Sequence, residues 1–217
     1  MILVPVKNLA NAKQRLASLL DQPTRTKLAQ AMLFDVLEAI SRSQGGLEVG
    51  LVTTDPFATN LAGQFNFRLI PDHANLGETD AIAMATRFCE SLGIDSTLVI
   101  PGDIPLVRAS ELDQILEAAP TAGSVIVPAA DGRGTNAILR RPAGLFPLRF
   151  GNDSFQPHLT AARAANRPCV VLSLPGIALD IDNPDDLRQL AAAPGQTRSQ
   201  QLVRQWDLTD LPLAANQ

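Results

Sequence analysis

Short apolar runs alternate along this chain with longer segments in which apolar residues recur every three or four positions. A short apolar run bounded by turn residues is typical of a buried strand, and the longer recurrence is typical of a helix packed on one side. Strands joined by helices form a mostly parallel sheet. We therefore predict an α/β fold, a mixed, mostly parallel sheet flanked by helices, with strands at 2–6, 48–53, 67–70, 97–101, 124–128, 136–140, 169–172 and 178–181.

Helices fill the gaps between these strands. Pro23 opens the first, whose apolar stripe continues until the Gly45-Gly46 pair stops it, and others are expected at 79–92, 110–119, 154–165 and 184–192. The strands at 136–140 and 169–172 follow Gly or Pro and are candidates for antiparallel additions. We expect one domain over 1–193, followed at 194–217 by a tail or a docking helix carrying Leu202, Val203, Trp206 and Leu208.

The charge balance excludes several classes of partner. The net charge is −4 and no stripe of Lys or Arg occurs, which argues against binding nucleic acid or an anionic membrane. Cys89, Cys169, His73 and His158 are too scattered for a zinc site, so any metal is expected to be a hard ion held by carboxylates. The apolar start at 1–6 is too short for a membrane span and lacks a basic leader, so we expect a cytoplasmic protein.

Asp103 is the first candidate functional residue, because it follows the strand expected at 97–101. In an open parallel sheet, ligands bind beyond the carboxyl ends of the strands, where this carboxylate is expected to lie. Aspartate also favours turns, so spacing alone gives a structural role in the turn equal weight.

A second acidic segment lies at 179–187. Asp180 and Asp182 are two residues apart in a strand-like stretch and are expected on one face, whereas Asp185 and Asp186 suit the dipole of the helix that follows. Magnesium takes one or two protein carboxylates together with substrate phosphates, and it relieves the repulsion between like charges. We predict a Mg²⁺ site that Asp103 completes. The alternative is a solvated acidic loop.

The segment at 131–137 offers donors for a phosphate or a carboxylate. Two glycines flank Arg133 and permit close backbone approach, and Thr135 and Asn136 add polar groups. As a bare pattern, a hairpin turn is the stronger alternative.

The segment at 151–158 offers a similar set at an expected helix start. Gly151 precedes Ser154 by three residues, so free backbone N–H groups and a hydroxyl make an anion site. The alternative is helix capping by Asp153 or Ser154. A lone histidine one turn later, His158, is more often structural than catalytic.

Lys7, Lys13 and Arg15 form a local cluster of cations after the first expected strand, which suits a triphosphate. The chain contains no G-x-x-x-x-G-K-[ST], G-x-G-x-x-G or G-x-S-x-G pattern. P-loop, dinucleotide-dependent and triad hydrolase chemistries therefore lose their usual support.

Five segments together resemble one enzyme family. They are V-P-V-K-x-L-x-x-A-K-x-R-L at 4–16, G-D-I-P-L at 102–106, G-T-N at 134–136, G-x-x-S-F-x-x-H at 151–158 and L-D-I-D-x-P-x-D-L at 179–187. In this order they are similar to the guanylyltransferases of coenzyme F-420 biosynthesis, which activate 2-phospholactate, phosphoenolpyruvate or 3-phosphoglycerate with GTP. The resemblance spans residues 2–193, and residues 75–80 depart from the family pattern, as does the Pro101-Gly102 pair.

The resemblance implies a single-domain, Rossmann-like fold of the nucleotide-diphospho-sugar transferase type. It also assigns residues by position. Asp103, Asp180 and Asp182 match the metal-binding acids; Thr135, Gly151 and Ser154, with Asn136 beside them, match the groups that hold the acceptor; Lys7, Lys13 and Arg15 match the segment that faces the GTP phosphates.

The implied reaction is attack by a phosphate oxygen of a three-carbon phospho-acid on the α-phosphorus of GTP, with release of pyrophosphate. Because the acceptor is already an anion, catalysis reduces to positioning and charge neutralisation, with Asp103 and Lys13 as catalytic residues and Mg²⁺ as cofactor. The expected partners are GTP, the phospho-acid and a downstream transferase that consumes the labile product. Two alternatives stay open: another nucleotidyltransferase with a molybdopterin or sugar-phosphate acceptor, and a non-catalytic GTP-binding module.

Overall fold

A seven-stranded mixed sheet forms the centre of the computed structural model, which describes residues 1–151 and 153–206. The strand order is β3-β2-β1-β4-β6-β5-β7. Within the described residues, β6 alone runs antiparallel to its neighbours. The predicted mixed, mostly parallel sheet is therefore confirmed. The strands are β1 (Ile2–Pro5), β2 (Val49–Val52), β3 (Arg68–Ile70), β4 (Thr97–Val99), β5 (Gly123–Pro128), β6 (Thr135–Arg141) and β7 (Cys169–Val171).

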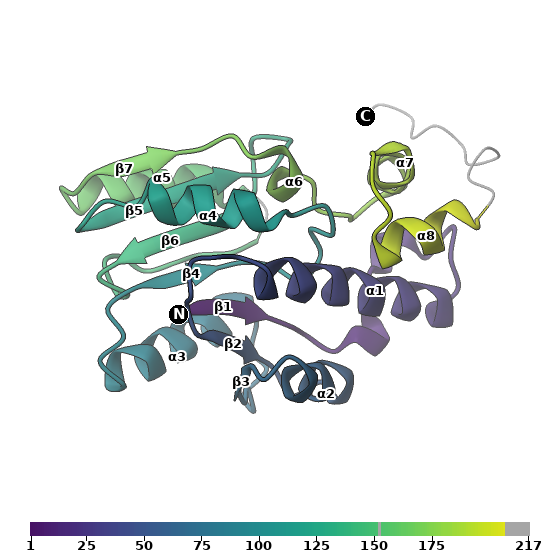
Figure 1. Ribbon diagram of the computed structural model, residues 1–217, viewed down its shortest axis with the longest axis horizontal. Helices are drawn as coiled ribbons and strands as arrows, with labels where there is room; N and C mark the ends of the chain where they lie inside the picture. The colour runs from purple at the N-terminus through teal and green to yellow at the C-terminus, as the bar shows by residue number, and fades with distance from the viewer. Residues whose placement is uncertain (152, 207–217) are drawn as a thin grey trace.

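Helices cover both faces of this sheet. Figure 1 shows α1 and α4 in front of the sheet and α5 behind it, with α7 and α8 together beside one end of α1. Among the described residues, no helix combines the length and apolarity needed to cross a bilayer. The helices are α1 (Gln22–Ser41), α2 (Pro56–Gln64), α3 (Glu78–Ser91), α4 (Ala109–Glu117), α5 (Phe155–Ala164), α6 (Pro175–Ala178), α7 (Pro184–Ala192) and α8 (Arg198–Arg204), with short 3-10 turns η1 (Leu9–Asn11) and η2 (Gln14–Leu16).

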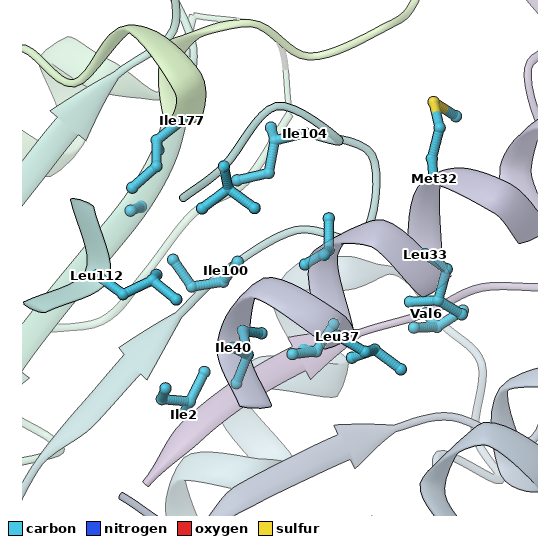
Figure 2. Close-up of a cluster of buried hydrophobic side chains, with 14 of the residues drawn as sticks. Ile2, Val6, Met32, Leu33, Leu37, Ile40, Ile100, Ile104, Leu112 and Ile177 are labelled. Atoms are coloured by element: carbon cyan, nitrogen blue, oxygen red, sulfur yellow. The ribbon is translucent and has the colours of Figure 1, made fainter. Parts of the chain in front are cut away.

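Two apolar cores follow from the alternation of side chains along each strand. Ile2 and Val4 of β1 join the core beneath α1, whereas Leu3 between them joins the core beneath α3 and α5. Figure 2 shows the first core, where Leu37 and Ile40 of α1 lie close to the strand. Strands buried on both faces read as continuous apolar runs, which is why the sequence pattern located them well.

Two predictions about individual elements need correction, and one helix was not predicted. The strand expected at 178–181 is wrong, because α6 ends at Ala178 and the next residues form no strand; the Ile181 N–H donates to the Asp103 carbonyl instead (3.1 Å). The segment at 169–172 forms β7, which pairs in parallel with β5 and is not an antiparallel addition. Helix α2 was not predicted, although Asp55 caps its start by accepting from two backbone N–H groups.

The strand order sets the place where a ligand can bind. The chain runs from β1 outward to β3 and then returns to the other side of β1 as β4, so the order reverses between β1 and β4. Ligands of open α/β sheets bind beyond the strand ends at such a reversal. Because β6 is antiparallel, its first residues, Thr135 and Asn136, arrive at the same edge where the parallel strands end.

The C-terminal part described by the structure is a docked helix. Val203 of α8 is fully buried in the core beneath α1, and the Arg198 guanidinium lies 3.2 Å from the centre of the Phe34 ring. Buried Asp35 of α1 accepts hydrogen bonds from the Arg198 N–H, the Ser199 N–H and the Ser199 hydroxyl at 2.9, 2.9 and 2.6 Å. Leu208 lies outside the described residues, and a domain boundary at 193 stays a prediction.

Replacing Asp35 by alanine is expected to destabilise the protein by about 2–3 kcal/mol, because two N–H groups of α8 lose their acceptor. This corresponds to a melting temperature about 5–10 °C lower for a chain of this size. Glu38→Ala is the matched control on the same helix, since its ion pair with Arg42 is exposed and is worth little. Equal melting temperatures for the Asp35 and Glu38 variants would contradict the role of Asp35 as the anchor of α8.

Candidate active site

Two cavities open at the edge where β1 and β4 end. The first measures about 440 Å³ and is lined by the segment after β1, by the middle of α1 and by the loop after β4. The second measures about 320 Å³ and is lined by the β5–β6 turn and by the loop before α5. Arg15, Glu78, Pro101 and Asp103 line both cavities. A molecule in either cavity therefore lies next to the Asp103 carboxylate.

Lys13 lies at the centre of this edge. Its ammonium donates to Asp103 Oδ2 at 2.7 Å and to Asp182 Oδ1 at 2.9 Å, and Arg15 reaches the other oxygen of Asp182 at 3.2 Å. The Lys13 side chain is only 7% exposed, whereas both aspartates are about one-third exposed. The structure thus brings together four predicted residues, two basic and two acidic, from three distant segments of the chain.

The electrostatics of this cluster favour the charged forms of Lys13 and Asp182. Burial acts to lower the pKa of Lys13, but attraction by Asp103 and Asp182 outweighs it and raises that pKa. Burial likewise acts to raise the pKa of Asp182, and Lys13 with Arg15 reverses this and lowers it. Lys13 also has a left-handed backbone, with φ +56°, which costs a non-glycine residue about 1 kcal/mol or more. Such strain is typical of a functional position.

Asp180 lies on the side of the second cavity. Asn136 at the start of β6 donates to Asp180 Oδ1 at 3.0 Å and also to the carbonyls of Ile177 and Ala178. Burial raises the pKa of Asp180, the Asn136 hydrogen bond opposes this, and the charges of Asp103 and Asp182 add to it. The three predicted acids are therefore close enough to repel one another, although they come from separate segments.

The donor set fits a hard divalent cation that shares its coordination with a substrate. Among the described residues, no three His, Cys, Asp or Glu side chains form a group that could hold a metal alone. Lys13 separates Asp103 from Asp182, whereas Asp103 and Asp180 both face the second cavity. Magnesium accepts one or two carboxylates together with phosphate oxygens. Asp103 and Asp180 suit that arrangement, and the magnesium site stays a prediction.

The predicted anion-binding residues line the second cavity together. Thr135 and Asn136 come from the start of β6, and Gly151 and Ser154 come from the loop before α5. Ser154 is the N-terminal residue before α5, but its side chain makes no capping hydrogen bond. The alternative that Ser154 serves as a helix cap is therefore not supported.

His158 orients the Thr135 hydroxyl. The Arg149 N–H donates to His158 Nε2 at 2.9 Å, so the hydrogen of the neutral ring is on Nδ1, which donates to Thr135 Oγ1 at 2.9 Å. Burial lowers the pKa of His158 to about 4, and the charge of Arg140 adds to this. Thr135 accepts from the ring and keeps its own hydrogen available to a molecule in the second cavity. The structural role expected for His158 thus serves the site.

Acid should destabilise the protein through His158. Its pKa is about 4 in the folded chain and 6.5 in the unfolded chain, so the unfolded chain binds more protons between these values, and stability falls as the pH drops through that window. Between pH 7 and pH 5 this amounts to about 2 kcal/mol. Urea unfolding at both pH values should show that His158→Gln removes this part of the loss, whereas a His73→Gln control at an exposed position keeps it. A full acid-dependent loss in His158→Gln would refute the assignment.

Two residues at this edge were not among the predicted site residues. Glu78 begins α3 and lines both cavities, and burial raises its pKa to about 7, with a further rise from Asp103 and an opposing effect from Lys7. Arg133 lines the second cavity. For Glu78, the only sequence signal was its place in the segment at 75–80, which departs from the family pattern.

Lys7 lies apart from the other predicted cations. It lines the first cavity, but its ammonium pairs with Asp72 at 2.8 Å and approaches Asn75 Oδ1 at 3.4 Å. Lys13 and Arg15 instead contact the acids at the junction of the cavities. The predicted basic cluster therefore divides into one residue at the wall and two at the junction.

Comparison with known proteins identifies the family of this chain. A family model described as "Guanylyl transferase CofC like" matches residues 1–213. The chain belongs to this family. A phosphoenolpyruvate guanylyltransferase of Conexibacter woesei is 36% identical to this CofC-like chain over 190 residues, which cover 87% of the chain and 85% of the relative. One of Roseiflexus castenholzii is 37% identical over 204 residues, covering 94% and 93%.

A more distant relative has a related guanylyltransferase name, and a solved structure shares the fold. A 2-phospho-L-lactate guanylyltransferase of Methanothermobacter thermautotrophicus is 29% identical to the CofC-like chain over 210 residues, covering 97% of the chain and 92% of the relative. A nucleotide-diphospho-sugar transferase-like crystal structure from Desulfovibrio desulfuricans superposes with a TM-score of 0.77 at 20% identity, covering 94% and 93% of the two chains. The predicted fold type is confirmed, and the CofC-like chain is an enzyme of the nucleotidyltransferase class.

Proposed function

We propose that this chain transfers GMP from GTP to the phosphate of a three-carbon phospho-acid and releases pyrophosphate, as a step of coenzyme F-420 biosynthesis. The observation that carries the proposal is the pair of cavities that meet at Asp103, with Lys13 and Arg15 at their junction. A transfer between two anionic substrates needs two adjoining sites with cations between them.

The first cavity is suited to GTP. Its wall combines apolar side chains, including Leu9, Met32 and Leu33, with the cations Lys7, Lys13 and Arg15. An apolar wall suits a base and a sugar, and the cations suit a triphosphate. The second cavity is the more polar of the two, and its hydroxyls from Thr135 and Ser154 suit the phosphate and carboxylate of the acceptor.

The mechanism needs no protein nucleophile. An acceptor phosphate oxygen attacks the α-phosphorus of GTP, a new P–O bond forms, and the bond from the α-phosphorus to the bridging oxygen of the β-phosphate breaks, so that pyrophosphate leaves with the electron pair. Lys13 and Arg15 hold the triphosphate and offset the charge that develops on the leaving group. When bound by Asp103 and Asp180, magnesium would supply further charge neutralisation at the phosphates.

The acceptor is a phosphoenolpyruvate, 2-phospho-L-lactate or 3-phospho-D-glycerate type of molecule. The names of the relatives support the first two, and the resemblance of the motifs supports the third. These acids share one phosphate and one carboxylate and differ by small groups, and such differences are worth about 1–3 kcal/mol in a pocket. We expect one preferred acceptor and measurable turnover of another.

The test is pyrophosphate release by the purified protein with Mg²⁺ and GTP. Each of the three phospho-acids is compared with pyruvate and lactate, which lack the phosphate, and ATP and CTP replace GTP in parallel reactions. Release that requires both GTP and a phospho-acid supports the proposal and identifies the acceptor. GTP binding without release, with any acceptor, contradicts it and favours a non-catalytic GTP-binding module.

A further inference from the structure

An ion pair at the rim of the second cavity is not used in the proposed mechanism. Arg133 in the turn between β5 and β6 faces Asp153 in the loop before α5. Arg133 Nε lies 2.5 Å from Asp153 Oδ1, and Arg133 Nη2 lies 3.1 Å from Asp153 Oδ2. Two parallel N–H bonds to one carboxylate are the arrangement in which a guanidinium recognises a carboxylate most specifically.

The charges around the second cavity show why this arginine matters. The described residues that line it include two cations, Arg15 and Arg133. Arg15 also lines the first cavity and contacts Asp182 there, whereas Arg133 lines the second cavity alone. The same lining contains five carboxylates, from Glu78, Asp103, Asp131, Asp153 and Asp180. Magnesium on Asp103 and Asp180 would serve the acceptor phosphate, so the acceptor carboxylate needs a separate cation on its own side of the site.

We propose that Arg133 determines acceptor specificity by adding a charged contact to the acceptor carboxylate, beside the hydroxyls of Thr135 and Ser154, and that Asp153 is an internal counter-ion which this carboxylate displaces. The inference rests on the proposed function and deepens it. The Asp153 carboxylate occupies the two donors of the guanidinium that an acceptor carboxylate would use. The acceptor phosphate is then directed toward Asp103 and the first cavity, where it must attack.

The surroundings of the pair favour such an exchange. The side chains of Arg133 and Asp153 are 65% and 62% exposed, so water solvates both and little free energy holds them together. The Arg133 backbone is fixed more firmly. Its N–H donates to Asp131 Oδ1 at 2.8 Å, and its carbonyl accepts from the Phe155 N–H at 2.8 Å. A fixed backbone with a solvated side chain lets the guanidinium change partners without moving the loop.

Substitutions of Arg133 and Asp153 are expected to change the KM for the phospho-acid in opposite directions. Arg133→Gln should raise the KM for the phospho-acid by about 10- to 100-fold, which is typical of the loss of a charged bidentate contact. Asp153→Asn should lower this KM by about 2- to 5-fold, because the internal competitor loses its charge. Both variants should leave the KM for GTP within about twofold of the wild-type value, and an exposed control on α5, Arg163→Gln, should change neither constant.

A carboxamide analogue, 2-phospholactamide, tests which acceptor group Arg133 binds. Wild-type protein should use it less well than 2-phospholactate, and Arg133→Gln should lose this discrimination. If both variants raise the phospho-acid KM and lower the melting temperature together, the pair is a structural link between two loops and the inference is overturned. The inference also fails if Arg133→Gln raises the KM for GTP as strongly as the KM for the acid.

Failure of the proposed function gives a different result. In that case the wild-type protein releases no pyrophosphate with any phospho-acid. Calorimetric titration of 2-phospholactate into the wild-type protein, Arg133→Gln and Asp153→Asn, with Mg²⁺ present, still decides the inference. Weaker binding to the first variant and tighter binding to the second support it, and equal affinities for all three proteins, or no binding, overturn it.

Discussion

Lys13→Met is expected to lower kcat/KM for pyrophosphate release by at least about a thousandfold. The ammonium is the buried cation at the junction of the two cavities, and it contacts Asp103 and Asp182. Without it, the triphosphate loses a charged donor, Asp103 loses its ion pair, and Asp182 keeps only its ion pair with Arg15. Steady-state kinetics with GTP and the preferred phospho-acid measure the loss. Lys27→Met, at an exposed position on α1, is the matched control and should keep wild-type kinetics.

The same variant gives a second readout that does not depend on turnover. The two carboxylates that flank Lys13 are about one-third exposed, so the protein should still fold without the ammonium. A divalent cation should then replace part of the missing charge. We expect Mg²⁺ to raise the melting temperature of Lys13→Met more than that of the wild-type protein. Near wild-type turnover in Lys13→Met would remove this residue from the reaction.

Asp103→Asn is expected to reduce turnover by about 10³-fold or more while the melting temperature changes little. Asp103 lines both cavities, pairs with Lys13 and contributes to the raised pKa of Asp180. The amide keeps the shape of the side chain but removes the charge that positions the ammonium and suits a metal ion. Single-turnover and steady-state pyrophosphate assays measure the effect.

Asp95→Asn is the control for this change, because Asp95 is exposed just before β4, whereas Asp103 lies just after it. The control should keep wild-type turnover. A rate for Asp103→Asn within about tenfold of the wild-type rate would contradict its place at the centre of the reaction.

The sequence predicted the sheet well and its smaller elements less well. Strands buried on both faces have continuous apolar runs, and the helix after Pro23 has a regular apolar stripe. In these segments the local pattern and the tertiary packing favour the same secondary structure. The segment at 178–181 has the same apolar character but forms no strand, because its backbone bonds to two loops. Local pattern contains no information about such long-range partners.

At the site, too, the sequence identified functional residues but not the contacts between them. The sequence predicts that Lys13, Asp103 and Asp182 are functional. It predicts the lysine as a phosphate ligand and the aspartates as metal ligands, not as partners of one another. Their direct contact joins residues that lie 90 and 169 positions apart. The role of His158 as the support of Thr135 was equally out of reach, because it depends on which ring nitrogen accepts from Arg149.

Within the described residues, β6 is the one antiparallel strand, and this bears on how the acceptor preference of such an enzyme can change. The groups assigned to GTP follow β1 and β4, which are central strands tied to neighbours on both sides. Several groups assigned to the acceptor lie instead on one hairpin: Arg133 in its turn, and Thr135 and Asn136 at the start of β6. Changes at a hairpin tip leave a sheet intact. Substitutions in this hairpin can therefore change the acceptor preference without changing the groups assigned to the nucleotide.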